Sequence, residues 1–99
     1  MPDLEIKVIE IKGNCPVYKK GDEFYILDGY KLKTKELICM HSLFSLTPYY
    51  VALSKGILPK EIGLSKNNHE AYIQCLDPCE YTGGGTVIFR IAKVDDKHK

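Results

Sequence analysis

The stretch TKELICMHSLFSLTPYYVALSKG, residues 34–56, is the longest segment of the chain with a helical pattern. Its apolar side chains recur at helical spacing, at Leu37, Met40, Leu43 and Phe44. This spacing predicts an amphipathic helix with one apolar face turned towards a core. Thr34 is suited to cap the first turn of that helix through its hydroxyl group.

Thr47-Pro48 interrupts this helical pattern. Proline has no amide hydrogen and clashes with the preceding turn, so it is best placed at the first position of a new helix. We therefore predict a second short helix over residues 48–55, capped by Thr47 and ended by Gly56. A single kinked helix is the alternative.

Two strands are predicted before the helical stretch, at residues 4–12 and 24–27. In the first strand, apolar and polar residues alternate up to Val8, and the alternation then shifts by one position. Such a shift would turn the apolar face outward unless a bulge absorbs it, so we expect a bulge or a strong twist near Val8 and Ile9. The dipeptide Asp28-Gly29 after the second strand is a turn signal that would close a hairpin.

Two further strands are predicted after the helices, at residues 71–76 and 86–93, with a glycine-rich loop at 77–85 between them. The predicted fold is an α+β domain over residues 1–94. In it, a small antiparallel sheet of two strand pairs packs against two short helices, in the order β-β-α-α-β-β. Residues 95–99 form a charged tail that is expected to fray.

Length and composition are those of one ordinary globular domain. The chain has 99 residues, of which 44% are hydrophobic and 27% are charged. Its 14 basic residues against 13 acidic ones disfavour binding to nucleic acid, which needs a positive surface. We found neither a signal-peptide pattern nor an apolar stretch long enough to cross a bilayer, which predicts a cytoplasmic protein without membrane contact.

The four cysteines are the residues with the most chemical potential. Cys15 lies in the turn after the first strand, Cys39 in the first predicted helix, and Cys75 at the end of the third strand. Cys79 follows after three intervening residues. Free cysteines are most often small core residues, but a bound zinc ion, an iron–sulfur cluster or redox thiols are open alternatives. His41 is a weaker candidate ligand, because residues two apart on a helix point in different directions.

The glycine run at residues 83–85 precedes a strand instead of a helix, so we interpret it as a hairpin loop and not as a phosphate cradle. A catalytic role for Cys15 as a nucleophile would need a base, which could only be His41 or His69. We located no complete catalytic constellation, so the sequence points away from an enzyme.

Six segments of the chain form a signature: residues 13–16 (GNCP), 21–24 (GDEF), Cys39, 46–49 (LTPY), Gly56 and 75–78 (CLDP). On these segments the chain resembles a family of small prokaryotic proteins of uncharacterised activity. The resemblance covers nearly the whole chain. It implies that Cys15, Cys39 and Cys75 form one set and that Cys79 is additional. Family members often carry a proline where this chain has Leu76, so the last loop is expected to differ.

Two functional hypotheses follow. The first is a small cytosolic accessory protein in which Cys15, Cys39 and Cys75 converge on a metal or redox site, with an open position if a metal is bound. The second is a non-catalytic protein-interaction module, with buried structural cysteines and a surface rich in tyrosines such as Tyr49, Tyr50 and Tyr72 that binds a protein partner.

Overall fold

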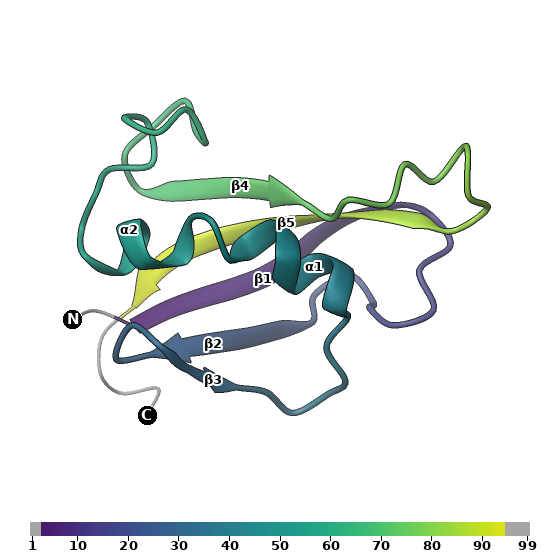
Figure 1. The fold of residues 1–99 in the computed structure, drawn as a ribbon, viewed down its shortest axis with the longest axis horizontal. Coiled ribbons are helices and arrows are strands. Elements are labelled where there is room, and N and C mark those ends of the chain that lie inside the picture. The colour runs from purple at the N-terminus through teal and green to yellow at the C-terminus, as the bar shows by residue number, and fades with distance from the viewer. Residues whose placement is uncertain (1–2, 95–99) are drawn as a thin grey trace.

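The computed structural model describes residues 3–94 as one α+β domain (Figure 1). Its elements, in chain order, are β1 (Asp3–Gly13), β2 (Glu23–Leu27), β3 (Lys31–Lys33), α1 (Met40–Leu46), α2 (Tyr50–Ser54), β4 (Glu70–Gln74) and β5 (Gly85–Val94). The charged tail at 95–99 lies outside the described residues. Within the described part of the chain, no helix is long and apolar enough to cross a membrane.

The strands form one five-stranded antiparallel sheet in the order β3-β2-β1-β5-β4. This confirms the α+β class with two helices between the early and late strands, but it corrects two details. The predicted hairpin turn at Asp28-Gly29 leads into a third strand, β3, which pairs with β2. The two predicted strand pairs are not separate, because β1 pairs with both β2 and β5.

The predicted bulge in the first strand is confirmed. The pairing of β1 with β5 shifts register between Val8 and Glu10. Before the shift, Leu4, Ile6 and Val8 are buried, and after it Ile11 is the residue that packs against the core. One extra residue in the strand therefore keeps apolar side chains on the core side through all of β1.

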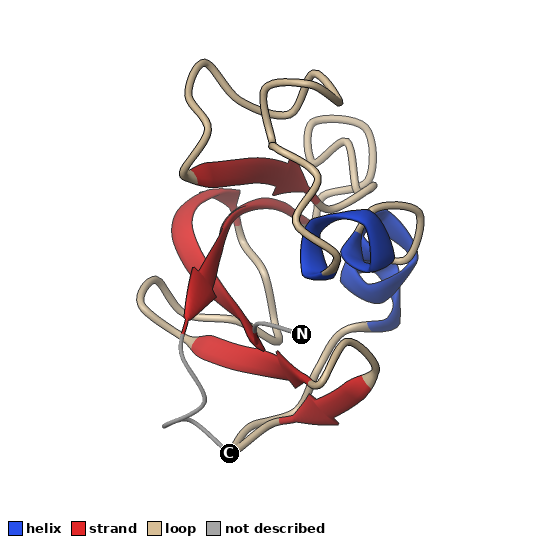
Figure 2. Cartoon of the chain, turned by 90° about the vertical axis from the view of Figure 1, so that its left-hand side faces the viewer, coloured by secondary structure: helices blue, strands red, loops and turns tan. Residues whose placement is uncertain are grey.

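The helices cover one face of the sheet and enclose the core against it (Figure 2). The predicted inward positions of the late strands are confirmed, since Ile73, Cys75 and Phe89 are all buried. Tyr18, from the loop between β1 and β2, joins this core. Its ring meets the ring of Phe89 edge to face, with centroids 5.4 Å apart.

The first helix begins later than predicted. Helix α1 starts at Met40, and Thr34 lies in an irregular segment instead of capping it. Residues 34–39 must carry the chain from β3 at the sheet edge to the helical layer, as Figure 1 shows. Extended chain covers about 3.3 Å per residue against about 1.5 Å in a helix, which is why this crossing is not helical.

The predicted apolar face of the first helix is also wrong in part. Three of its four residues are exposed to solvent: Leu37 by 84%, Met40 by 58% and Phe44 by 60%. The buried positions of α1 are Ser42 and Leu46 instead. The inward side of α1 is therefore made by Leu46 and by Ser42, whose hydroxyl is hydrogen-bonded to Tyr18 and to Cys39 O.

The interruption at Thr47-Pro48 divides the segment into two helices, as predicted. Thr47 ends the first helix instead of capping the second, because its amide donates to Leu43 O at 2.9 Å. Helix α2 then starts at Tyr50 and ends ahead of Gly56, whose φ is +93°. That left-handed conformation suits glycine and stops the helix.

Candidate functional site

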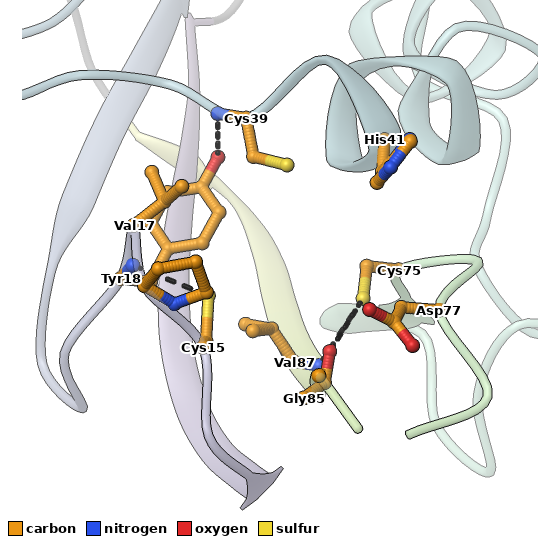
Figure 3. A pocket seen from close by; sticks show the side chains of 11 residues that line it. Cys15, Val17, Tyr18, Cys39, His41, Cys75, Asp77, Gly85 and Val87 are labelled. Carbon is orange, nitrogen blue, oxygen red and sulfur yellow. Dashed lines mark hydrogen bonds between the residues drawn. The ribbon is translucent and has the colours of Figure 1, made fainter. Parts of the chain in front are cut away.

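Three cysteines from distant parts of the sequence line one cavity of about 330 Å³ (Figure 3). Cys15 comes from the loop after β1, Cys39 from the start of α1, and Cys75 from the residue after β4. We call this space the cysteine cavity. His41 and Asp77 also line it, so it brings together thiol, imidazole and carboxylate groups.

Cys15 is held by a tight turn and by the start of β5. The Tyr18 amide donates to Cys15 Sγ at 3.3 Å. Gly85 opposes Gly13 in the pairing of β1 with β5. A Cβ on Gly85 would come within 2.7 Å of the Cys15 amide nitrogen, so only glycine allows this approach. Gly83 and Gly84 lie in the loop between β4 and β5, as predicted, whereas Gly85 is the first residue of β5 and sets the position of the Cys15 backbone.

Cys39 is the N-cap residue of α1 and has extended backbone angles, with φ −79° and ψ 130°. Its amide donates to the Tyr18 hydroxyl oxygen at 3.1 Å. Ser42 Oγ donates its single proton to Cys39 O at 2.7 Å, so Tyr18 is the donor in its 2.6 Å contact with Ser42. This closed network joins Cys39 to the loop that carries Cys15.

Tyr18 is therefore the residue that links two walls of the cavity. Its side chain is buried, and this burial raises the pKa of the Tyr18 hydroxyl above 10.0, against the opposing effect of its hydrogen bond to Ser42. A hydroxyl that stays protonated keeps donating to Ser42 over the whole physiological range. Sequence reasoning did not single out Tyr18. The available signal was its place three residues after Cys15, where an amide can reach a cysteine sulfur.

Cys75 is the most buried of the cysteines that line the cavity and is only 5% exposed. Its amide continues the sheet by donating to Val87 O at 2.9 Å. The Val87 amide donates to Cys75 Sγ at 3.4 Å. Two of the three sulfurs that line the cavity thus accept a backbone N–H, a contact that tunes metal-bound thiolates in iron–sulfur proteins.

Asp77 shapes the loop between β4 and β5. Its carboxylate accepts a short hydrogen bond from the Thr82 hydroxyl, and its backbone oxygen accepts one from Thr86 Oγ1 at 2.5 Å. A side chain on Gly84 would collide with this carboxylate. Asp77 therefore holds this loop through its hydrogen bonds and also lines the cavity.

The other candidate residues lie elsewhere. Cys79 packs against Gly13, outside the residues that line the cavity. His69 lies near the start of β4, beside Leu4 and Ile91. Of the four cysteines only Cys75 is buried. Cys39 is partly exposed, so it is not a fully buried core residue, as free cysteines most often are.

His41 does line the cavity together with Cys39, despite the expectation that residues two apart on a helix diverge. The reason is that Cys39 is extended and lies before the helix, while His41 is in its first turn. Within residues 3–94, no three or more His, Cys, Asp or Glu side chains stand close enough together to hold one metal ion.

A comparison of the chain with models of known protein families, with curated proteins and with solved structures found no match.

Proposed function

We propose that the protein is a small cytosolic accessory protein that carries an iron–sulfur cluster in the cysteine cavity, on Cys15, Cys39 and Cys75. The single observation that carries this proposal is the convergence of three thiols from distant segments on one cavity. Thiolates are the usual protein ligands of iron–sulfur clusters.

The size of the cavity favours a cluster over a single zinc ion. Zinc–sulfur bonds of about 2.3 Å in a tetrahedral site bring the sulfurs to within about 3.8 Å of one another. The three cysteines here stand around a space of about 330 Å³, which one ion would not fill. A cluster distributes its ligand positions over several iron atoms, so its thiolates stand further apart.

The surroundings of the sulfurs support the same proposal. Backbone amides donate to Cys15 Sγ and to Cys75 Sγ, at 3.3 and 3.4 Å. Hydrogen bonds to sulfur are among the factors that set the reduction potential of a cluster. Val87 adds an apolar wall on the sheet side. We infer a role in electron transfer or in carrying the cluster.

The test is a series of single cysteine-to-serine variants, each reconstituted with ferrous iron and sulfide under argon. We expect the wild-type chain and Cys79→Ser to take up iron and show the broad visible absorption of a cluster, because Cys79 lies outside the cavity. Cys15→Ser, Cys39→Ser and Cys75→Ser should lose most of the iron while keeping a wild-type circular dichroism spectrum. Equal iron content in all five proteins would contradict the proposal.

A protein-interaction module is the second candidate function, favoured by the exposed apolar side chains of α1. Met40 and Phe44, one turn apart, both face solvent, and soluble monomers rarely leave contiguous apolar surface uncovered. If the partner is a second copy of the chain, this function predicts self-association, measured by sedimentation velocity, that is abolished by Met40→Ser with Phe44→Ser and left unchanged by Cys15→Ser.

A further inference from the structure

Three cysteines leave one ligand position of a cluster to another group, and the structure offers few donors for it. The side chains with a lone pair that line the cysteine cavity, apart from the thiols, are Tyr18, His41 and Asp77. The Tyr18 hydroxyl is engaged with Ser42 and with the Cys39 amide, at 2.6 and 3.1 Å. The choice is therefore between His41 and Asp77.

Asp77 is already hydrogen-bonded within its own loop. Its carboxylate accepts from Thr82, and the Thr82 hydroxyl also accepts from the Gly84 amide at 3.1 Å. Moving the carboxylate further into the cavity would break its hydrogen bond with the Thr82 hydroxyl, which helps to hold the loop between β4 and β5. Carboxylate oxygen is also a harder donor than the thiolates beside it, and soft sulfur sites prefer imidazole as a partner ligand.

The imidazole ring of His41 is not engaged in this way. Among the described residues, none forms a hydrogen bond or an ion pair with its imidazole ring. Figure 3 shows the ring projecting from α1 over the cavity, on the side of Cys75. His41 is exposed to solvent, so its ring can turn about its side-chain bonds without repacking the core.

The geometry points to His41 as the fourth ligand of the cluster, an inference that rests on the proposed function. A neutral imidazole nitrogen would bind the iron that the three thiolates leave open. Replacing a thiolate with a neutral nitrogen removes one negative charge from the ligand set, and histidine ligation raises the reduction potential for this reason. His41 is exposed and lines the cavity, so a metal that it held would be open to solvent and to a partner.

The test is pulsed electron paramagnetic resonance on the reduced, reconstituted protein labelled with ¹⁵N-histidine. We expect a strong ¹⁵N hyperfine coupling in the wild-type chain, its loss in His41→Ala, and its retention in the matched control His69→Ala. His69 lies near the start of β4, outside the cavity, so its removal should leave the cluster unchanged.

A second variant, His41→Cys, separates ligation from a merely structural role. It should keep the iron content, lose the ¹⁵N coupling and shift the reduction potential to more negative values. A wild-type cluster without ¹⁵N coupling would overturn the assignment of His41 and leave the three-cysteine site standing. A wild-type chain that takes up no iron would overturn both.

Discussion

The two faces of the sheet both carry polar side chains, but these bond to one another on one face and line a cavity on the other. On the face away from the helices, Arg90 pairs with Glu5 at 3.4 Å and with Glu70 at 3.2 Å. Tyr25 donates to Glu5 and to Glu23 on the same face. The polar groups there are partners of one another, so this face is a self-contained surface network.

On the helical face, Cys15, Cys39, Cys75 and His41 converge on a cavity instead. In the described part of the chain, no hydrogen bond joins these four side chains to one another. Backbone amides donate to the sulfurs of Cys15 and Cys75, and the Cys39 amide donates to the Tyr18 hydroxyl oxygen. Polar groups that hydrogen-bond to one another stabilise a fold. Polar groups that face a shared cavity without bonding to one another are available to bind a ligand.

The largest expected effect comes from Gly85→Ala, which would break the close approach of β5 to the Cys15 turn. The new Cβ would come within 2.7 Å of the Cys15 amide nitrogen and 2.8 Å of Asn14 C, both of them backbone atoms. We expect a loss of about 3 kcal/mol in the free energy of unfolding, measured in urea, together with loss of iron uptake. A variant with wild-type stability and iron content would show that this contact does not position the site.

Tyr18→Phe against Tyr25→Phe compares the two faces directly. Removing the Tyr18 hydroxyl leaves the partly buried Cys39 amide without its acceptor, and we expect a loss of about 1–2 kcal/mol in the free energy of unfolding. Removing the Tyr25 hydroxyl removes its hydrogen bonds to Glu5 and Glu23 on the open face, and we expect a change within about 0.5 kcal/mol. Equal losses in urea denaturation would remove the distinction between the faces.

The ion pairs of the open face should contribute little. Arg90→Met removes both ion pairs. In the wild-type protein the Arg90 side chain is 30% exposed, so solvent screens its interaction with the two carboxylates. We expect the free energy of unfolding to fall by less than about 1 kcal/mol and the effect to shrink in high salt. Iron uptake should be unchanged, since Arg90 does not line the cavity.

The smallest effect is a pH dependence on the same face. Partial burial and the neighbouring carboxylates Glu23 and Glu5 raise the pKa of Tyr25 from 10.0 to about 12. Folding therefore favours its protonated form, and the resulting stabilisation is complete below pH 10 and lost as the pH rises from 10 to 12. The phenolate absorbance of wild type minus that of Tyr25→Phe should titrate near pH 12. A midpoint near pH 10 would contradict the network.

Alternation in the sequence predicted most of the sheet, including the bulge after Val8, because a half-buried strand repeats every two residues. The start of α1 was missed, because it depends on how far residues 34–39 must travel across the sheet, which local spacing does not contain. Leu37 lies in this segment, before α1 begins, and is exposed.

The site was less predictable than the fold. The sequence marked the three cysteines, but their approach depends on the pairing of β1 with β5, which sets Gly13 opposite Gly85. Side chains two residues apart within one helix do point in different directions. This does not apply to Cys39 and His41, because Cys39 lies before the helix. The resemblance to a prokaryotic family stays a prediction.

Iron and acid-labile sulfide in the wild-type protein, purified without oxygen, are the most direct test of the central claim. An iron–sulfur cluster on Cys15, Cys39 and Cys75 predicts equal amounts of the two elements, about two or four of each per chain according to the cluster type. A chain with neither element, in which all four cysteines titrate as free thiols after unfolding, would contradict it.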